Sequence, residues 1–329
     1  MKLIIWLLLS FALSACSDIV VSSEEKTMKT QSIVLGMGCF WGAEKRMSEV
    51  PGVVAVESGY ANGEIEGAYD AVLAHEQALR WRRSSQRNHA EVVKVKFDPT
   101  QVALETVLAQ FWESHNPTQG DRQGNDIGSN YRSAIYTTDD AHLETARASK
   151  LAYENALRQA GHGSITTEVE PLKAYFTAEE YHQKYLVKNS NGYCGLGGTG
   201  VKFPVTWLGK RLLSDEQYHI AFAQGTEAPF CGPYLTEKRK GTFIDPLTGV
   251  PLFKSEHKFD SRTGWPSFYQ PIEGAVTQHR DVSHGRVRVE VRSASSGIHL
   301  GHVFDDGPAP TGQRFCINGN VLRFIPDPT

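Results

Sequence analysis

GMGCFWGAEKR, residues 36–46, places a cysteine between a glycine and two bulky aromatic residues. The apolar run SIVL before it is typical of a buried strand, and the run AEKRMSEV after it has helical composition and ends at Pro51 and Gly52. We therefore expect a strand, a turn and a helix, with Cys39 in the turn. Free backbone N–H groups and the helix dipole favour a thiolate there, which would make Cys39 a nucleophile. The alternative is a buried cysteine that acts as a small hydrophobic residue.

Length and composition exclude one class of function. The chain has 329 residues, of which 40% are hydrophobic and 22% charged, so it is long enough for two globular domains with a core each. Its formal net charge of -3 leaves no polybasic footprint of the kind that binds nucleic acid. No nucleic-acid partner is expected.

The N-terminus has the pattern of an export signal. MKLIIWLLLSFALSAC combines Lys2, an apolar run over 3–13 and small residues before Cys16, and the run is too short to span a bilayer comfortably. LSAC resembles the bacterial lipobox, in which the chain is cut before the cysteine and the cysteine is acylated. We expect a signal peptide at 1–15 and a lipid-anchored tether at 16–31, which places the protein in a bacterial cell envelope outside the cytoplasm, facing the periplasm in a Gram-negative cell. An uncleaved anchor, or a signal cut elsewhere, is the alternative.

The pattern of elements changes near the middle of the chain. In the first half, helix-like segments such as PTQVALETVLAQFWESH and DDAHLETARASKLAYENALRQAG alternate with strand-like ones such as EVVKVKF, SAIYT and TTEVEPL. The second half has short strands with period-two alternation, as in RVRVEVR, separated by Gly and Pro turns. We predict an N-terminal α+β domain (a mixed sheet with flanking helices) at 32–200, a linker at 201–213 and a mainly β domain (antiparallel sheets, sandwich-like or barrel-like) at 214–329. The stretch GLGGTG lacks the Lys-Ser/Thr ending of a phosphate-binding loop.

The cysteines allow two interpretations. Apart from Cys16, the chain has Cys39, Cys194, Cys231 and Cys316, and it contains no CxxC pair. None of them has a histidine at zinc-finger spacing, so no structural zinc is expected. A general thiol-disulfide oxidoreductase would have a CxxC motif. Spacing leaves open both structural disulfides, typical of exported proteins, and catalytic thiols with resolving partners.

Five blocks of the first half resemble, in order, the motifs of peptide methionine sulfoxide reductase A. They are GMGCFWGAEKR, GYANG at 59–63, HAEVVKVKFDP at 89–99, FWESHNPTQGDRQGNDIGSNYRSAIY at 111–136, and FTAEEYHQKYL at 176–186 with GYCG at 192–195. The second half resembles the B-type enzyme through GTEAPF at 225–230, LFKSEHKFDSRTGWPSF at 252–268, HLGHVFDDGP at 299–308 and RFCINGN at 314–320. The order matches known fusions of the two. The resemblance implies reduction of methionine sulfoxide in proteins, peptides and the free amino acid, with the S epimer taken by the first domain and the R epimer by the second.

This reaction needs a nucleophile that attacks the sulfoxide sulfur while the oxygen is protonated and leaves, and a thiolate that does so becomes a sulfenic acid. For the first domain the resemblance implies Cys39 as nucleophile, Phe40 and Trp41 as an apolar grip on the substrate methyl group, Glu91 as the acid, Tyr60 and Tyr131 as donors to the oxygen, and Asp126 in support. We expect Glu91 to be partly buried and protonated, because desolvation raises the pKa of a carboxyl. Without the motif it would be taken for a solvated carboxylate on a strand face.

For the second domain the resemblance implies a parallel set of residues. Cys316 would be the nucleophile, Trp265 would pack against the methyl group, Arg314 and Asp306 would tune and orient the thiolate and the histidines, and Asn318 would complete the pocket. His299 and His302, three apart in HLGH, can face one site and deliver a proton to the departing oxygen. As a metal pair they lack a third ligand at recognisable spacing, so no metal is expected.

A second cysteine is needed to return each sulfenic acid to a thiol, through a disulfide that an external reductant opens. Cys194 matches the family's recycling position for Cys39, and its neighbouring glycines would let it move. The commonest B-type resolving position is Thr263 in this chain, which leaves Cys231 as the partner of Cys316. The family implies a thioredoxin-type donor and no bound cofactor.

Two stretches depart from the family pattern. GTFIDPLTGVPLF lacks the two CxxC zinc pairs of many B-type domains, and AHEQALRWRRSSQRN at 74–88 is inserted ahead of Glu91. The insertion carries four arginines and Trp81. We expect a solvated helix or a disordered segment there, and the alternative is a loop that contacts acidic substrate or lipid head groups.

Two other functions also stay open. One is a thiol protease or acyltransferase, although the Cys39 half lacks the His–Asn partnership that such an enzyme uses. The other is a non-catalytic lipoprotein with two structural disulfides.

Overall fold

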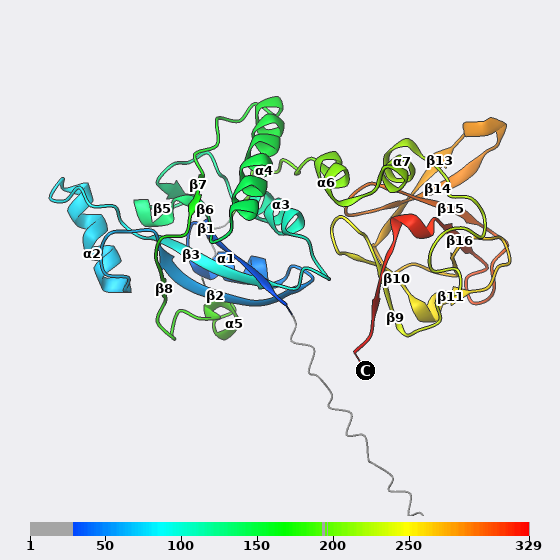
Figure 1. The fold of residues 1–329 in the computed structure, drawn as a ribbon, viewed down its shortest axis with the longest axis horizontal. Coiled ribbons are helices and arrows are strands. Elements are labelled where there is room, and N and C mark those ends of the chain that lie inside the picture. The colour runs from blue at the N-terminus through cyan, green and yellow to red at the C-terminus, as the bar shows by residue number, and fades with distance from the viewer. Residues whose placement is uncertain (1–28, 193–194, 196, 329) are drawn as a thin grey trace, which may run out of the picture.

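The computed structural model describes residues 29–192, 195 and 197–328. Cys16 and Cys194 lie outside the described residues, and what the sequence predicts for them stays a prediction. Figure 1 shows two bodies side by side, the first ending after helix α4 (Asp140–Gln159) and the strands and turns that follow it, the second beginning near helix α6 (Val205–Leu212).

The first body is built on a six-stranded sheet of order β7-β6-β1-β3-β2-β8. Its strands are β1 (Gln31–Met37), β2 (Val53–Ala61), β3 (Ala90–Phe97), β6 (Ser133–Thr137), β7 (Glu168–Pro171) and β8 (Tyr175–Thr177). All neighbours are antiparallel except β6 and β7, which are parallel. The mixed sheet predicted from the sequence is confirmed. The central strand β3 has consecutive buried valines because both faces of the sheet are covered there.

Helices pack against this sheet, and their apolar side chains join those of the strands in one core. The remaining elements are α1 (Phe40–Ser48), α2 (Tyr69–Arg80), α3 (Leu104–Ser114), α5 (Tyr185–Lys188), the short pair β4 (Arg122–Gln123) and β5 (Asp126–Ile127), and the 3-10 turn η1 (Ser129–Tyr131). Helix α4 starts at a side-chain cap, where Asp139 accepts the backbone N–H of His142 at 2.9 Å. Trp112 of α3 is fully buried and donates its indole N–H to the hydroxyl of Ser149 on α4 at 2.9 Å, which fixes the two helices against each other.

Helix α2 includes the first part of the insertion, residues 74–80, and projects from the body (Figure 1). Val72 is its one fully buried side chain. The expectation of a solvated helix is confirmed for residues 74–80, whereas residues 81–88 continue as turns and loop.

The second body is mainly β, as predicted. Sheet β10-β9-β17 consists of β9 (Gly241–Ile244), β10 (Pro251–Lys254) and β17 (Arg323–Pro326). Sheet β11-β12-β16-β15-β14-β13 consists of β11 (Lys258–Phe259), β12 (Ser267–Phe268), β13 (Val276–Asp281), β14 (Arg288–Ser293), β15 (His299–Phe304) and β16 (Arg314–Ile317), and all pairs in both sheets are antiparallel. Three 3-10 turns, η2 (Ser255–His257), η3 (Ser283–Gly285) and η4 (Gly319–Val321), join them. Phe253 stacks on Phe268 with ring centroids 4.4 Å apart, inside the core that both sheets share.

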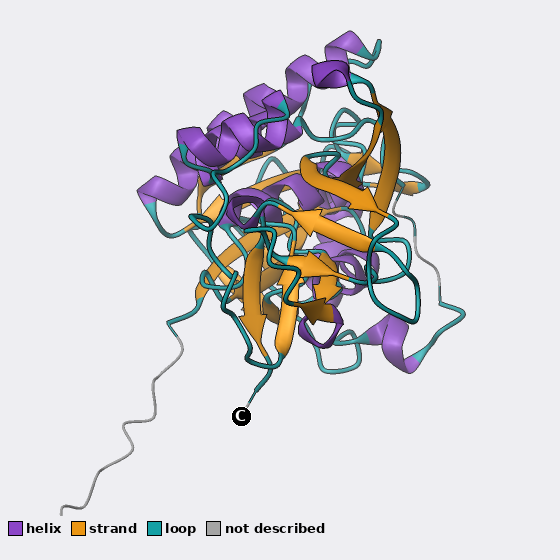
Figure 2. Cartoon of the chain, turned by 90° about the vertical axis from the view of Figure 1, so that its right-hand side faces the viewer, coloured by secondary structure: helices purple, strands orange, loops and turns teal. Residues whose placement is uncertain are grey.

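The predicted linker contains helix α6, which is followed by α7 (Asp215–Ala223). A capping box between Ser214 and Gln217 fixes the start of α7. The view turned by 90° (Figure 2) shows helices in a row along one side of the chain and strands beneath them.

The two bodies contact each other directly. The hydroxyl of Thr106 on α3 donates to the carbonyl of Leu247 at 2.7 Å, and the guanidinium of Arg323 donates to the carbonyl of Gln101. Buried apolar side chains form one continuous cluster across the junction. Within the described part of the chain, no helix combines the length and the apolar character needed to cross a bilayer.

Candidate active sites

Cys39 lies at the junction predicted from the sequence, directly between β1 and α1. It is the N-cap residue of α1, and its carbonyl accepts the first helical N–H, from Ala43, at 3.4 Å. Gly38 just before it has φ +95°, in the left-handed region that favours glycine, which lets the chain turn sharply from strand to helix. The strand, turn and helix are therefore confirmed.

The charge state of Cys39 differs from the prediction. Burial and the nearby negative charge of Glu91 raise the pKa of the thiol to about 12, with a smaller contribution from Asp126. The N–H groups of Trp41 and Gly42 at the helix start lower the pKa, as the sequence argument assumed, but they are outweighed. The expectation of a resting thiolate was wrong: at neutral pH Cys39 is a thiol.

Glu91 lies on β3, where it pairs across the sheet with Tyr60 of β2. Its side chain is only 2% exposed, and one carboxyl oxygen accepts the backbone N–H of Phe40, the residue after Cys39, at 3.3 Å. The other oxygen accepts the amide N–H of Asn130 at 3.2 Å. Burial raises the pKa of this carboxyl to about 8 in spite of both hydrogen bonds, so Glu91 is mostly a neutral acid at pH 7. The burial and protonation predicted for Glu91 are confirmed.

The two predicted tyrosine donors have different environments. Tyr60 is completely buried, and its hydroxyl donates to Glu179 at 2.9 Å, so that proton is already engaged. Tyr131, on the turn η1, is half-buried, and burial followed by the charge of Glu91 raises the pKa of its phenol. Both phenols are therefore protonated donors at neutral pH. Asp126 on β5 is near enough to Glu91 that its negative charge contributes to the raised pKa of that carboxyl.

An aromatic cluster surrounds the start of α1. Phe40 is buried with its ring 5.0 Å from the ring of His182, and Trp41 is half-buried and stacked on Tyr185 with centroids 3.7 Å apart. The indole of Trp41 donates to Nδ1 of His182 at 3.1 Å, so that nitrogen is unprotonated. Burial lowers the pKa of His182, which keeps its ring neutral.

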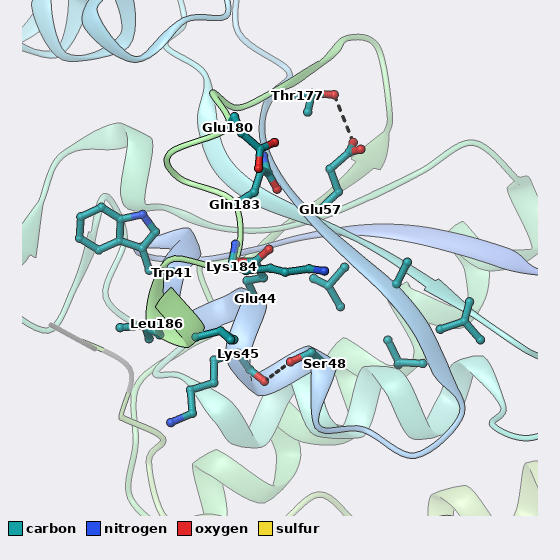
Figure 3. A pocket seen from close by; sticks show the side chains of 15 residues that line it. Trp41, Glu44, Lys45, Ser48, Glu57, Thr177, Glu180, Gln183, Lys184 and Leu186 are labelled. Atoms are coloured by element: carbon teal, nitrogen blue, oxygen red, sulfur yellow. Dashed lines mark hydrogen bonds between the residues drawn. The ribbon is translucent and has the colours of Figure 1, made fainter. Parts of the chain in front are cut away.

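A groove of about 680 Å³ adjoins Trp41 (Figure 3). One wall is a stripe of α1 at helical spacing, formed by Trp41, Glu44, Lys45 and Ser48. The opposite wall consists of the first residues of β2 and the segment 177–187. Trp41 is the member of the aromatic cluster that this groove shares, and Cys39 is not among its lining residues.

Three residues of this site were not identified from the sequence. Glu179 accepts the Tyr60 hydroxyl and also the backbone N–H of Tyr69, the latter at 2.8 Å. Tyr69 also lies near the thiol. Burial is the largest cause that raises the pKa of its phenol, and the charges of Glu91 and Cys39 raise it further. Asn130 binds the Glu91 carboxyl and is the neighbour of Tyr131; that adjacency was the only signal in the sequence.

The second thiol, Cys316, lies half-buried on β16. Burial raises its pKa, while the charge of Arg314 and hydrogen bonds from Thr263 and Arg314 lower it. Arg314 is held by Asp306 through two parallel hydrogen bonds of 2.8 and 2.9 Å. Arg314 and Asp306 thus form an ion pair beside the thiol, which was not predicted from the sequence.

The two histidines face one another because β15 is irregular. In a regular strand, residues three apart point to opposite faces. Here the pairing of β14 with β15 shifts between Val291 and Arg292, and the extra residue brings His299 onto the face of His302. Their ring centroids are 5.5 Å apart, and His302 is the direct cross-strand partner of Cys316.

Each histidine is bound to a carboxylate. His299 Nδ1 lies 2.8 Å from Glu290, and His302 Nε2 lies 2.8 Å from Asp281. Both rings line a cavity of about 300 Å³, and Nε2 of buried His299 has no hydrogen-bond partner among the described residues. Each carboxylate fixes the tautomer, leaving the opposite ring nitrogen free to exchange a proton. Neither Glu290 nor Asp281 was identified from the sequence, because they lie on other strands.

Trp265 and Asn318 are held by one loop. The indole of Trp265 donates to the carbonyl of Glu227 at 3.1 Å, and the amide oxygen of Asn318 accepts the N–H of Glu227 at 3.1 Å. The Asn318 amide also donates to the carbonyl of Leu300 at 3.0 Å. Both ends of the Asn318 side chain are thus engaged with backbone, which shapes the pocket wall.

Cys231 is exposed and follows this same loop. The N–H of Phe230 donates to the carbonyl of Gly264 at 2.8 Å, which ties the loop to the residue after Thr263. Because Thr263 hydrogen-bonds Cys316, a chain of contacts connects the residue before Cys231 with that thiol. Among the described cysteines, Cys39, Cys231 and Cys316 are all free thiols. No group of three or more His, Cys, Asp or Glu side chains in residues 29–192 and 197–328 is arranged to hold a metal ion.

Comparison with known proteins agrees with both halves. The family model for peptide methionine sulfoxide reductase matches residues 31–200, and the model for the SelR domain matches residues 213–326. Methionine sulfoxide reductase A of Corynebacterium diphtheriae is 42% identical over 53% of this chain and 83% of its own, with a TM-score of 0.44. Mxr1 from Saccharomyces cerevisiae is similar in its reduced form (31% identity, 53% of this chain, 92% of its own, TM-score 0.42) and in complex with Trx2 (28% identity, 49% and 91%, TM-score 0.30). The chain therefore belongs to the peptide methionine sulfoxide reductase family as an A-type domain followed by a B-type domain, and it reduces the S and the R epimers of methionine sulfoxide.

Proposed function

We propose that each activity depends on one cysteine: Cys39 attacks the S epimer and Cys316 attacks the R epimer. The observation that carries the first assignment is that Glu91, a buried acid with a pKa of about 8, binds the N–H of the residue after Cys39. An ionised Glu91 can take the thiol proton and then, as a neutral carboxyl, give a proton to a sulfoxide oxygen, and a pKa of about 8 keeps both forms accessible near neutral pH. If Cys39 were only structural, or Glu91 only a solvated carboxylate, nothing would require a buried carboxyl next to the thiol.

In the first site the reactive pair holds one proton: the thiol proton of Cys39 passes to the ionised carboxylate of Glu91, and the thiolate sulfur bonds to the sulfoxide sulfur. The Glu91 carboxyl then returns the proton to the sulfoxide oxygen. The protonated oxygen moves from the substrate sulfur to the Cys39 sulfur and the bond between the two sulfurs breaks, which releases methionine and leaves a sulfenic acid. The sulfoxide is reduced and the thiol is oxidised, with no change in the number of protons. Phe40 and Trp41 hold the methyl group, and Tyr60, Tyr131 and Asp126 support the oxygen site.

In the second site an imidazole replaces the carboxyl. The free nitrogen of His302, or of His299 behind it, accepts the proton of Cys316, and the adjacent carboxylate stabilises the imidazolium. The imidazolium then protonates the departing oxygen. Trp265 and Asn318 shape the methyl pocket, while Arg314, held by Asp306, favours the thiolate.

We infer that a second cysteine closes each cycle. Its thiol attacks the sulfenic sulfur, water leaves, and a disulfide forms. Cys194 serves Cys39 and Cys231 serves Cys316; the second pairing is supported by the contact chain through Phe230, Gly264 and Thr263. A thioredoxin-type dithiol then reduces the disulfide.

Substitution of each nucleophile tests the assignment. Cys39→Ser abolishes reduction of the S epimer and leaves the R epimer untouched, and Cys316→Ser does the reverse, when each epimer of a peptide sulfoxide is assayed separately. Loss of both activities from one variant, or of neither, would refute the division of labour. Glu91→Gln retains far more S-epimer turnover than Glu91→Ala, since an amide still donates to the oxygen; equal, near-wild-type rates for both would remove Glu91 from the mechanism.

The recycling pairs need a stoichiometric measurement. Treatment of the reduced chain with one equivalent of substrate and no reductant converts thiols to disulfides as methionine is produced, which mass spectrometry detects. Cys231→Ser completes one R-epimer turnover and then stalls with a thioredoxin-type reductant. Steady cycling by that variant would mean that another group resolves Cys316.

We further propose that the protein is an envelope lipoprotein, with a signal peptide at 1–15 and lipid on Cys16 at the start of the tether 16–31. The support is the sequence alone: a basic residue, a short apolar run and LSAC. Mass spectrometry of the chain purified from membranes is expected to show a diacylglycerol-modified Cys16 at the new N-terminus. A Cys16→Ala chain found in the membrane fraction in the same amount would contradict lipid anchoring.

A further inference from the structure

The inserted helix α2 ends in an exposed basic tip. We use this name for Arg80, Trp81, Arg82 and Arg83, all of which are exposed. Trp81 is 70% exposed, which is unusual for a large aromatic side chain. Figure 1 shows α2 reaching away from the sheet at one side of the body.

The basic tip has a defined shape. The N–H groups of Trp81, Arg82 and Arg83 donate to carbonyls of the last turn of α2 at 3.1, 2.9 and 2.8 Å. Further along the helix, Glu76 accepts the N–H of Ser129 at 3.0 Å, which fixes α2 to the turn η1. These hydrogen bonds fix the position of the basic tip relative to the first body.

The charges of the basic tip are not neutralised within the described residues. None of the arginines at 80, 82 and 83 forms an ion pair there, whereas Arg87 binds both Glu168 and Glu170. The chain as a whole carries a net charge of -3, so the positive charge of the basic tip is opposite in sign to the net charge of the protein. Three free guanidinium groups around an exposed indole point to an anionic partner.

We propose that the basic tip docks on an anionic lipid surface. Guanidinium groups bind phosphate in a planar, two-pronged geometry. Tryptophan favours the boundary between lipid head groups and hydrocarbon, where its ring is apolar and its N–H stays hydrated. Exposed groups at the end of a projecting helix can meet a deformable lipid surface, which provides many anionic groups in one plane.

This inference rests on the proposed lipid anchor, which keeps the chain at a membrane. Residues 17–30 separate Cys16 from β1 and span at most about 50 Å when extended. That reach lets the folded body turn until the tip meets the surface. The other end of α2 is Tyr69, whose ring lies 4.6 Å from His182, so the first active site would stand roughly one helix length, about 18 Å, above the lipid.

Hydrogen exchange on the acylated full chain tests the docking. The chain is reconstituted into vesicles of phosphatidylcholine alone or of phosphatidylcholine with phosphatidylglycerol. We expect the amides of residues 81–86 to exchange on the order of tenfold more slowly with phosphatidylglycerol, and the difference to disappear at high salt. Equal exchange in both vesicles at low salt would overturn the proposal.

The variant R80Q/R82Q/R83Q is expected to lose the slowing, and W81A to weaken it. The matched control R46Q/R158Q/K238Q removes the same charge from dispersed exposed positions and is expected to keep it. All three variants keep both sulfoxide reductase activities, since none of these residues lies in an active site. A slowing that survives in R80Q/R82Q/R83Q would also overturn the proposal.

Two arms separate this proposal from others. A soluble polyglutamate peptide added to phosphatidylcholine vesicles tests an acidic polypeptide as partner; slowing there, with none from phosphatidylglycerol, overturns the lipid assignment. Flotation with phosphatidylcholine vesicles reports on the anchor alone. If flotation fails there but returns with phosphatidylglycerol and depends on the three arginines, the anchor is wrong and the docking of the basic tip stands.

Discussion

Glu76 and Ser129 join the inserted helix to the turn that faces the first thiol. One carboxylate oxygen of Glu76 accepts both the backbone N–H and the hydroxyl of Ser129, the former at 3.0 Å, and also the amide of Asn88 at 3.2 Å. Ser129 begins the turn η1, whose next residue, Asn130, binds the Glu91 carboxyl. The insertion is therefore part of the support of the active site.

Glu76→Ala is expected to lower turnover of the S epimer by about tenfold and to destabilise the first domain by about 1–3 kcal/mol, because the N–H of Ser129 and the amide of Asn88 lose their acceptor. Glu76→Gln keeps one oxygen acceptor and should recover most of the loss. Asp70→Asn, at an exposed site on the same helix, is the control. R-epimer turnover by the same chain reports whether the effect is local. Wild-type S-epimer kinetics in Glu76→Ala would show that η1 holds its position without the helix.

The pH profile of the first site follows from the Cys39–Glu91 pair. The reactive state, thiolate with neutral acid, holds one proton, as does the state of thiol with carboxylate. Because the pKa of Glu91 is raised to about 8 and that of Cys39 to about 12, singly protonated pairs prevail between these values. kcat/KM for the S epimer should rise up to about pH 8 and then stay level. In Glu91→Gln the inflection should vanish and the rate should keep rising with thiolate, so an unchanged inflection would assign it to another group.

Stability should depend on the same carboxyl. The pKa of Glu91 in the folded chain, about 8, lies above its ordinary value of 4.5, so the folded state favours the protonated form. The contribution of Glu91 to stability is therefore fully present below about pH 4.5 and is lost as the pH rises through about 8. Urea unfolding of wild type and Glu91→Gln at pH 5 and pH 9 measures this. The variant is expected to gain relative to wild type at the higher pH; parallel curves would mean that Glu91 ionises freely in the folded state.

Periodic segments were predictable from the sequence, whereas contacts between distant segments were not. SAIYT coincides with β6, and the long apolar patterns around α3 and α4 identified those helices, because local periodicity reports burial directly. Glu179 could not be assigned, since its contact with Tyr60 joins residues that are 119 positions apart. The same holds for Glu290, which reaches His299 from a neighbouring strand.

The charge states of the site needed the fold as well. The start of α1 was readable from the sequence, and its N–H groups do lower the pKa of Cys39, but desolvation exceeds their effect. The depth of burial depends on which side chains close over the turn, and these include His182, far along the chain. For Glu91 the family motif alone predicted the acid role, and burial then supplied its physical basis.

The carboxylates behind the two histidines are expected to govern the second site. Glu290 binds His299 and also Arg292, and these partners lower its pKa, so it is ionised at neutral pH. Glu290→Gln keeps the shape of the side chain but removes the charge that stabilises an imidazolium. R-epimer turnover should fall by about 10²-fold or more, by analogy with loss of the carboxylate from a histidine–carboxylate pair.

Asp281→Asn tests which histidine exchanges the proton with Cys316. His302 is the cross-strand partner of Cys316, so Asp281→Asn should lower the R-epimer rate more than Glu290→Gln if His302 is the direct acceptor, and less if His299 is. S-epimer turnover and the urea midpoint of each variant serve as controls for folding. A change confined to stability, with R-epimer kcat and its pH profile intact in both variants, would show that the carboxylates only pack the sheet and that the imidazoles act without them.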